Sequence, residues 1–143
     1  MRPTYETQQD RVNEQQVIDL ICQRWKCTAR KTPAFYQTDW TLSRHGKVLA
    51  FVEIKFRNKS YDTYRLSLHK FSNMLLSSIA SKLHHILAVC WPEDGKRVVR
   101  YVEVTHDLHA EVVHGGRWDR GDTQDQEPMA EIPMSAFKLL GAL

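Results

Sequence analysis

The chain has 143 residues, of which 42% are hydrophobic and 26% charged, a composition typical of a folded protein with a hydrophobic core. No apolar run is long enough to span a membrane, and the polar N-terminus lacks the apolar centre of a secretory signal, so we expect one domain, 1–143, in the cytoplasm. The net charge of +3 permits a nucleic-acid partner without requiring one.

Residues 6–25 predict a helix. Ile18, Ile21 and Trp25 recur at steps of three and four, which is the spacing of one helical stripe. Glu14 lies four residues before Ile18 and shares that stripe, so we expect it to point at whatever the helix covers. The alternative is that Glu14, in the first half of the helix, lies at a solvent-exposed end.

Three strands are expected next. A short first strand covers 27–32, and a second covers 35–43. A turn with Gly46 available for positive φ joins the second strand to a third at 47–57, so these two strands form a hairpin.

The middle of the chain predicts a helix and a buried strand. A helical pattern covers 62–82, with Ser60 or Asp62 available as its N-cap. The continuous apolar run at 84–91 is typical of a strand buried on both faces. A strand, a helix and a further strand imply a parallel crossover, so the sheet is expected to be mixed.

The C-terminal part, 92–143, predicts a further strand at 97–104, a Gly- and Asp-rich polar loop at 114–128 and a short final helix at 134–143. The expected fold is therefore α/β. Its core, at about 6–91, has the order helix, strand, strand, strand, helix, strand around a mixed central sheet, and the rest is a C-terminal extension.

The third strand places charged side chains beside apolar ones. Strict alternation puts an apolar set on the face toward the core: Val48, Ala50, Val52, Ile54 and Phe56. The other face carries, in order, Leu49, Phe51, Glu53, Lys55 and Arg57. Burying Glu53 costs free energy unless it is paired or binds a cation. The alternative is a surface ion pair of Glu53 with Lys55 or Arg57 on a solvated edge.

Three further charged residues are expected near Glu53. In the predicted hairpin Asp39 pairs near Phe51, one diagonal step from Glu53 and within side-chain reach of it. Glu14 would approach from the first helix. Lys70 lies at the margin of the buried face of the second helix.

Carboxylates gathered in this way imply a cation, because like charges repel. Hard oxygen ligands favour Mg²⁺ or Mn²⁺. Such an ion can polarise a phosphoryl oxygen and lower the pKa of a coordinated water, and a neighbouring lysine can stabilise charge that develops on phosphate. Together these groups can hydrolyse a phosphodiester.

The pattern resembles the PD-(D/E)XK nuclease superfamily. The match consists of "TDW" at 38–40 and "EIK" at 53–55, two carboxylates separated by thirteen residues and then a lysine. The restriction-endonuclease-like core of that superfamily has the same order of elements as the one expected for 6–91. Thr38 stands where the superfamily's name has proline.

The resemblance implies a role for each matching residue. Asp39 and Glu53 would ligate Mg²⁺, which Mn²⁺ can replace, together with the backbone carbonyl of Ile54. Lys55 would orient the attacking water. The superfamily's first helix often brings a glutamate to the metal, and Glu14 would take that role, directly or through water.

Basic residues complete the site that the resemblance implies. The second helix of the superfamily often presents a lysine or glutamine, and Lys70 matches that position as a catalytic residue. Arg57, Lys59 and Lys70 would contact backbone phosphates of DNA, which gives salt-dependent binding with little sequence preference.

The function implied is that of a Mg²⁺-dependent DNA endonuclease, either structure-selective or nonspecific. So small a nuclease suits a phage or mobile-element genome, and resolving a junction would require a homodimer, because two symmetric cuts need two sites. The alternative is a noncatalytic nucleic-acid-binding or assembly protein that keeps the fold, although the intact set of Asp39, Glu53 and Lys55 argues against it.

Overall fold

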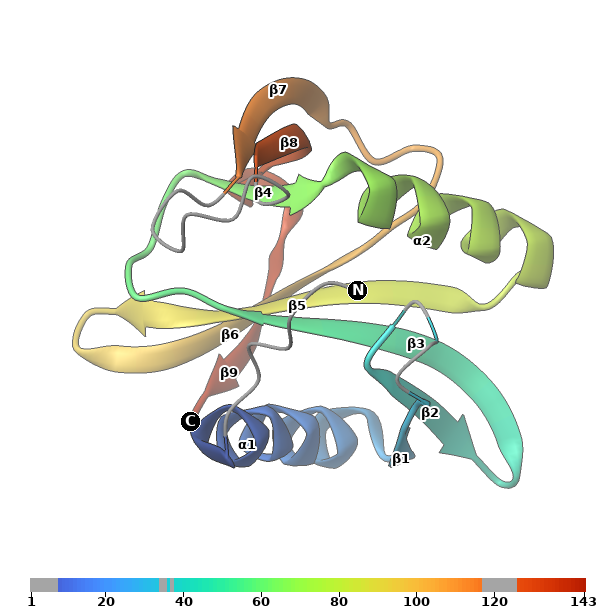
Figure 1. The fold of residues 1–143 in the computed structure, drawn as a ribbon. Coiled ribbons are helices and arrows are strands. Elements are labelled where there is room, and N and C mark those ends of the chain that lie inside the picture. The colour runs from blue at the N-terminus through green and yellow to red at the C-terminus, as the bar shows by residue number, and fades with distance from the viewer. Residues whose placement is uncertain (1–7, 34–35, 37, 117–125) are drawn as a thin grey trace.

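The computed structural model describes residues 8–33, 36, 38–116 and 126–143. A six-stranded sheet forms its centre, with one helix on one face and a second helix on the other (Figure 1). A three-stranded sheet lies on the same side as the second helix. The expected α/β class with a mixed sheet is confirmed.

Helix α1, Gln8–Trp25, confirms the helix predicted at 6–25 over its described part, and residues 6 and 7 lie outside the described residues. Val17, Ile18 and Ile21 are at most 1% exposed, so the predicted stripe faces the core. Glu14 on the same stripe is 8% exposed, which contradicts the alternative of a solvent-exposed position.

Strands β1, Thr28–Lys31, β2, Trp40–Arg44, and β3, Lys47–Phe56, follow as an antiparallel set. His45 and Gly46 form the turn between β2 and β3, with φ of 52° and 77°, so the positive φ predicted for Gly46 is confirmed. The second strand is shorter than expected, and its predicted residues 35 and 37 lie outside the described part of the chain.

The register of β2 against β3 differs from the predicted one by two positions at the far end of the hairpin. The two-residue turn shifts the pairing by one position, and Leu49, which bulges out of β3, shifts it by another. Trp40 consequently pairs with Val52, which brings Asp39 beside Glu53 rather than a diagonal step away.

The same bulge changes which side chains of β3 face the core. Ala50, Val52 and Ile54 are at most 5% exposed, as the alternation predicts. Val48, beyond the bulge, is 42% exposed, so its predicted place in the core is wrong. Leu49 packs against the core instead.

The segment expected to begin the second helix is a strand. Strand β4, Thr63–Ser67, buries Tyr64 and Leu66 in strand alternation, and helix α2, Leu68–Ser81, starts directly after it. The helix expected at 62–82 is therefore wrong in its first residues. Pairing with a C-terminal strand decides this segment, and the only local signal for it is the short polar–apolar alternation of 63–67.

The N-cap of α2 is Ser67, whose Oγ accepts a hydrogen bond from the backbone N–H of Lys70 at 3.4 Å. The predicted caps at Ser60 and Asp62 are wrong, because the chain there still precedes β4. The actual cap fixes the first turn of the helix and with it the direction of Lys70.

Strand β5, His84–Glu93, runs parallel to β3, so the predicted crossover through α2 is confirmed. Residues 85–91 are all buried, as expected of a strand covered on both faces. Strand β6, Lys96–Glu103, pairs with β5 in antiparallel fashion and confirms the next predicted strand.

The C-terminal segment is mostly extended. Strands β7, Glu111–Gly116, and β8, Gln126–Pro133, occupy both ends of the expected polar loop at 114–128. The middle of that loop, 117–125, lies outside the described residues. β7 and β8 pair with each other, and β8 also pairs with β4, which is distant in sequence.

The final helix expected at 134–143 is wrong. A short 3₁₀ turn, η2, Met134–Ala136, leads into strand β9, Lys138–Ala142, which pairs with β6. Leu140 of β9 is 8% exposed and joins the core that α1 covers. A short apolar run of this kind fits a helix or a strand, and an available sheet edge selects the strand.

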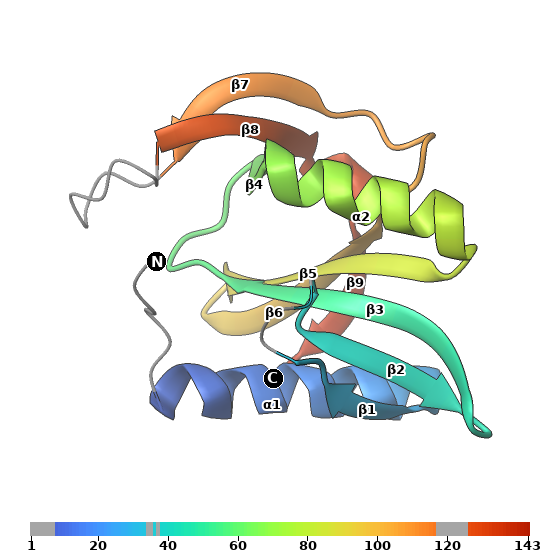
Figure 2. The ribbon, with the colours of Figure 1, turned by 45° about the vertical axis from the view of Figure 1, so that its right-hand side comes forward.

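The large sheet has the order β1-β2-β3-β5-β6-β9 and the small one β4-β8-β7. Figure 2 shows α1 below the large sheet, with α2 and the small sheet above it. The buried side chains form one core cluster on each face. No helix of the described residues is long and apolar enough to cross a membrane.

Candidate active site

Asp39 and Glu53 meet where β2 begins beside β3. The backbone N–H of Asp39 donates to the carbonyl of Val52 at 3.0 Å. Oδ2 of Asp39 accepts a hydrogen bond from the backbone N–H of Ile54, also at 3.0 Å. These bonds hold Asp39 as a continuation of β2, so the structure brings the two predicted carboxylates together.

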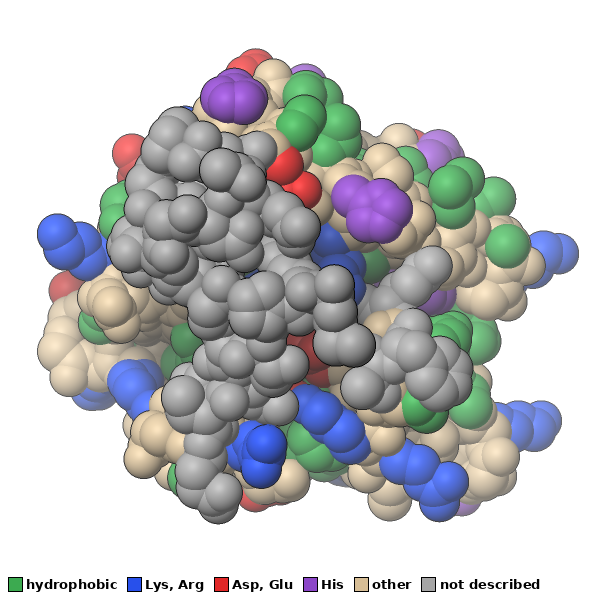
Figure 3. All heavy atoms as spheres, viewed as in Figure 1, with side chains coloured by type: hydrophobic (Ala, Val, Ile, Leu, Met, Phe, Trp, Pro, Cys, Tyr) green, Lys and Arg blue, Asp and Glu red, His purple; other side chains and the backbone are tan. Residues whose placement is uncertain are grey.

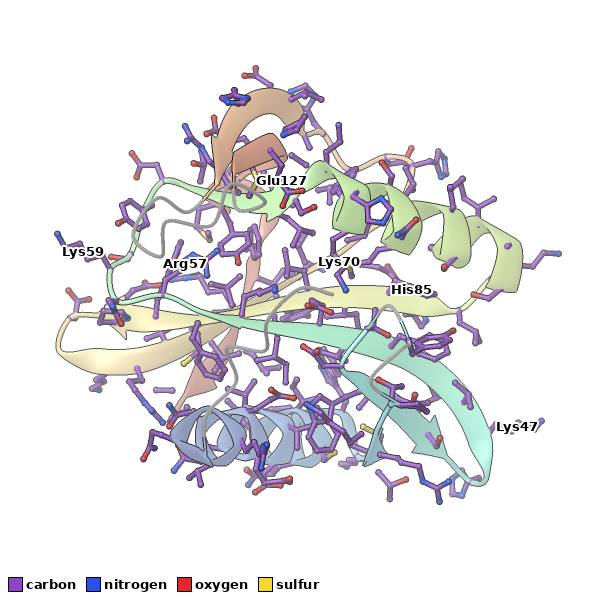
Figure 4. The ribbon with its side chains drawn as sticks, viewed as in Figure 1. Lys47, Arg57, Lys59, Lys70, His85 and Glu127 are labelled. Atoms are coloured by element: carbon purple, nitrogen blue, oxygen red, sulfur yellow. The ribbon has the colours of Figure 1, made fainter. Side chains whose placement is uncertain are left out.

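Glu53 is a buried carboxylate with a lysine near each oxygen. It is 3% exposed. Oε2 lies 3.3 Å from Nζ of Lys55 on the same strand, and Oε1 lies 3.4 Å from Nζ of Lys70 on α2. Figure 4 shows Lys70 reaching from α2 toward the large sheet. The structure thus joins a third and a fourth predicted residue to the carboxylate pair.

The pKa of Asp39 shows that a negative charge is disfavoured at this position beside Glu53. Burial, and after it the negative charge of Glu53, raise the pKa of Asp39 above its ordinary value. The N–H of Ile54 and the ammonium groups of Lys55 and Lys31 lower the pKa but do not cancel the rise. A carboxylate in this position therefore gains by taking up positive charge, as a proton or as a cation.

Lys55 is held in its charged form. Burial alone would lower its pKa, but the negative charge of Glu53, with further contributions from Tyr64 and Asp39, raises the pKa overall. Lys55 is consequently an ammonium at neutral pH. It can donate hydrogen bonds and stabilise negative charge, but it is not a general base in this state.

The donor set suits a divalent cation. Oε1 of Glu53 is buried and has no hydrogen-bond partner among the described residues, although it forms an ion pair with Nζ of Lys70 at 3.4 Å. The N–H of Ile54 bonds Asp39, and the carbonyl of a strand residue points to the same side as its N–H. Two carboxylates and this carbonyl match the hard oxygen ligands of Mg²⁺.

Glu14 approaches from α1 but pairs elsewhere. Its Oε1 accepts a hydrogen bond from Nε1 of Trp40 at 2.5 Å and forms an ion pair with Lys31. The described residues contain no group of three or more His, Cys, Asp or Glu side chains arranged to hold a metal. A direct contact of Glu14 with a metal therefore stays a prediction.

Three residues near the site were not identified from the sequence. Lys31 pairs with Trp40 across β1 and β2, and its ammonium lies 5.5 Å from the centroid of that ring. Thr38 and Tyr64 each bury a hydroxyl that has no hydrogen-bond partner within the described parts of the chain. Strand alternation over 63–67 would have revealed Tyr64, but the residues around Thr38 carry no such pattern.

Two of the three predicted phosphate-binding residues, Arg57 and Lys59, follow the end of β3, and the third, Lys70, lies on α2. The guanidinium of Arg57 lies over the ring of Tyr64, 4.7 Å from its centroid, and the backbone N–H of Arg57 donates to the carbonyl of Cys90 at 3.0 Å. Lys59 is exposed in the loop before β4 and points away from the sheet (Figure 4). Lys and Arg side chains also gather over α1, β1 and β2 on the face seen in Figure 3.

Comparison with known proteins finds a matching family and a similar fold. Residues 1–140 match the family described as "Phage putative PDDEXK endonuclease", so the likeness extends past the core at 6–91 into the C-terminal segment. No curated protein matches the chain.

One solved structure with a similar fold is that of Hjc, a Holliday junction resolvase from the archaeal hyperthermophile Archaeoglobus fulgidus. The TM-score is 0.54 and the identity 16%, over 86% of this chain and 84% of that one. At this identity the likeness shows the fold alone.

Proposed function

The chain belongs to the family of phage PD-(D/E)XK endonucleases, and we propose that it is a metal-dependent endonuclease that hydrolyses phosphodiester bonds of DNA. The observation that carries the proposal is the pair of half-buried Asp39 and buried Glu53, with Lys55 and Lys70 beside the two oxygens of Glu53. A protein that uses this fold only for binding has no need to bury repelling carboxylates at one point.

Asp39, Glu53 and the carbonyl of Ile54 are the groups that would hold Mg²⁺ or Mn²⁺. A bound ion of this kind polarises a phosphoryl oxygen and lowers the pKa of water. The raised pKa of Asp39 supports the assignment, because a bound cation offsets both causes of the rise, the burial of the carboxylate and the repulsion by Glu53. Glu14 would contact the ion directly or through water.

Lys55 and Lys70 act on the substrate from fixed positions. Their side chains are 37% and 28% exposed, and each ammonium lies beside Glu53. Lys55 orients the attacking water. Lys70 and Arg57 donate to phosphate oxygens and offset the charge that develops there in the transition state.

The DNA is expected to be recognised by its shape and backbone. The groups assigned to it, Arg57, Lys59 and Lys70, are cations that would bind backbone phosphates, which carry no sequence information directly, and this favours structure-selective or nonspecific cutting. A four-way junction is the most informative structured substrate. Cutting it symmetrically would require a homodimer, because each protomer supplies one site.

The test is cleavage of supercoiled plasmid, linear duplex, single strands and four-way junctions, with Mg²⁺, Mn²⁺ or EDTA. Wild-type protein should cut at least one of these DNAs with either metal and none in EDTA. Glu53→Gln and Lys55→Met should lose at least about 100-fold in rate, the usual size of an electrostatic catalytic contribution.

The matched control is Glu103→Gln, which removes a carboxylate paired with His84 on the strands beyond the site. It should cut like the wild-type protein. Binding of DNA by wild-type protein without cleavage under any metal condition would instead support the noncatalytic alternative. Equal cleavage by Glu53→Gln and wild type would contradict the proposed site.

A further inference from the structure

Three rings are stacked in a row on the large sheet. The ring of Tyr36 lies over that of Phe51, with centroids 5.5 Å apart and planes inclined by 31°. Phe51 lies in turn against the ring of His85, at 5.0 Å and 32°. These angles are nearer to parallel than to edge-on, so the contacts join the faces of neighbouring rings. We call these three residues the ring stack.

The ring stack lies on the same face of the sheet as the carboxylates of the candidate site. Phe51 and Glu53 are two residues apart on β3, and Val52 between them belongs to the core on the α1 side. Side chains alternate along a strand, so Phe51 and Glu53 both point to the α2 side, about 7 Å apart along the strand. His85 pairs with Phe51 from β5. A ligand held on the ring stack therefore lies beside the proposed metal site.

Tyr36 is the solvent-exposed end of the ring stack. It is 45% exposed, whereas His85 at the other end is 2% exposed. Phe51 covers one face of the Tyr36 ring, and the backbone N–H of Tyr36 donates to the carbonyl of Pro33 at 2.9 Å. A single exposed tyrosine needs no explanation. One that extends a row of rings beside two repelling carboxylates is a fixed aromatic surface on which a ligand can stack.

An exposed arginine shares this face of the sheet. Ala29 on β1 packs against the core on the α1 side, so the next residue, Arg30, points to the side of the ring stack. Arg30 pairs with Thr41, and Thr41 pairs with Phe51. The backbones of Arg30 and Phe51 are thus two strand spacings, about 10 Å, apart. The guanidinium of Arg30 can therefore bind a phosphate next to a group stacked on the ring stack.

A nucleotide with an uncovered base fits this surface. Bases stack on aromatic side chains whatever their sequence, because every base has a π-face. Inside a duplex each base is already covered by its neighbours, so a base must leave that arrangement before it can meet the Tyr36 ring. The cations on either side, Arg30 and the lysines beside Glu53, suit the phosphates of the same strand.

We propose that the open face of Tyr36 stacks on an unpaired base next to the phosphate that is cut. Because DNA is taken as the ligand, this assignment rests on the proposed function. It narrows the substrate class to DNA that offers an unpaired base at the site of cutting, such as a single-stranded segment that joins or ends a duplex.

Fluorescence anisotropy in EDTA measures binding without cleavage, with a fluorescein-labelled oligothymidine strand and a labelled blunt duplex of the same length as probes. Tyr36→Leu keeps an apolar side chain on Phe51 and removes the aromatic ring. It should bind the single strand roughly 5- to 100-fold more weakly, the usual effect of losing one stacked base. Its affinity for the duplex should stay at the wild-type value.

Two further substitutions separate the ring from its hydroxyl and from the fold. Tyr36→Phe and Tyr36→Trp keep an aromatic face and should both bind the single strand at least about as tightly as the wild-type protein. The control Leu139→Ala removes an apolar side chain that is 59% exposed on β9, at the opposite edge of the large sheet. It should bind both probes as the wild-type protein does. Thermal unfolding in EDTA should show every variant folded at the assay temperature.

Three results would overturn the proposed stacking. Wild-type affinity of Tyr36→Leu for the single strand would show that the ring contacts no base. An equal loss of affinity for strand and duplex would show that the ring does not select unpaired bases. A loss in Tyr36→Phe and Tyr36→Trp as large as in Tyr36→Leu would show that no stacking is involved. Because binding in EDTA requires no cutting, a wild-type protein that binds the strand through Tyr36 and cuts no DNA would refute the nuclease function alone.

Discussion

Replacing Lys70 with methionine should destabilise the protein through Glu53. The substitution keeps most of the apolar stem of the side chain and removes the ammonium that lies 3.4 Å from Oε1 of Glu53. A carboxylate that is 3% exposed then loses one of its two cationic partners. Destabilisation is the expected direction, because the buried charge can no longer be neutralised from both sides.

The size of the effect follows from distance and exposure. Two unit charges 3.4 Å apart attract by about 5 kcal/mol at an effective dielectric constant of about 20. Desolvation of Glu53 offsets much of this attraction, and Lys70, with 28% of its side chain exposed, is screened by solvent. Lys55 remains 3.3 Å from the other oxygen. We therefore expect a loss of about 1–2 kcal/mol, less than the roughly 3–5 kcal/mol of a buried charge left without any partner.

Thermal and urea unfolding at pH 7 in EDTA measure this loss. For a chain of this size, about 1–2 kcal/mol corresponds to an unfolding temperature lower by roughly 3–6 °C. A double-mutant cycle with Glu53→Gln should give a coupling free energy of about the same 1–2 kcal/mol. The control Lys47→Met changes an exposed lysine at the remote end of β3 (Figure 4). A loss no larger than that of Lys47→Met, or a coupling near zero, would refute the reasoning.

Three further predictions concern other parts of the molecule. Burial lowers the pKa of His85, so the stability that the neutral imidazole contributes is present above the ordinary pKa of about 6.5 and is lost as the pH falls. Between pH 7 and 5 the wild-type protein should therefore lose more unfolding free energy than His85→Gln, and parallel pH profiles of the two proteins would contradict this. Arg57→Gln should weaken DNA binding and lower the salt slope by about one, measured by fluorescence anisotropy, and an unchanged slope would exclude a phosphate contact. Ser67→Ala removes the N-cap of α2 and should cost about 1 kcal/mol in urea unfolding, a value that Ser72→Ala in the helix should not reach.

The carboxylate pair was predictable because it depends on short-range rules. A tight turn and strand alternation are enough to place Asp39 near Glu53, and the prediction survives an error in the register. The bulge at Leu49 has no clear sequence signal, yet it moves Asp39 closer to Glu53 and turns Val48 out of the core. Local pattern therefore gives the neighbourhood of the site, and the bulge sets its geometry.

The surroundings of the pair depend on contacts between distant segments. Strand β4 exists because it pairs with β8, some 60 residues later, for example Leu66 with Ala130. The helical reading of this segment hid Tyr64, because a residue in a helix would not alternate with Leu66. The partners of Glu14 were hidden in the same way, because Lys31 and Trp40 meet it only when α1 packs on the sheet.

The central claim is that Asp39 and Glu53 hold the catalytic metal, and the most direct measurement is anomalous diffraction from crystals soaked in Mn²⁺. We predict one strong peak bounded by Asp39, Glu53 and the backbone carbonyl of Ile54, which disappears in Glu53→Gln crystals treated in the same way. Crystals that show no peak there, at a Mn²⁺ concentration at which the protein cuts DNA in solution, would contradict the account.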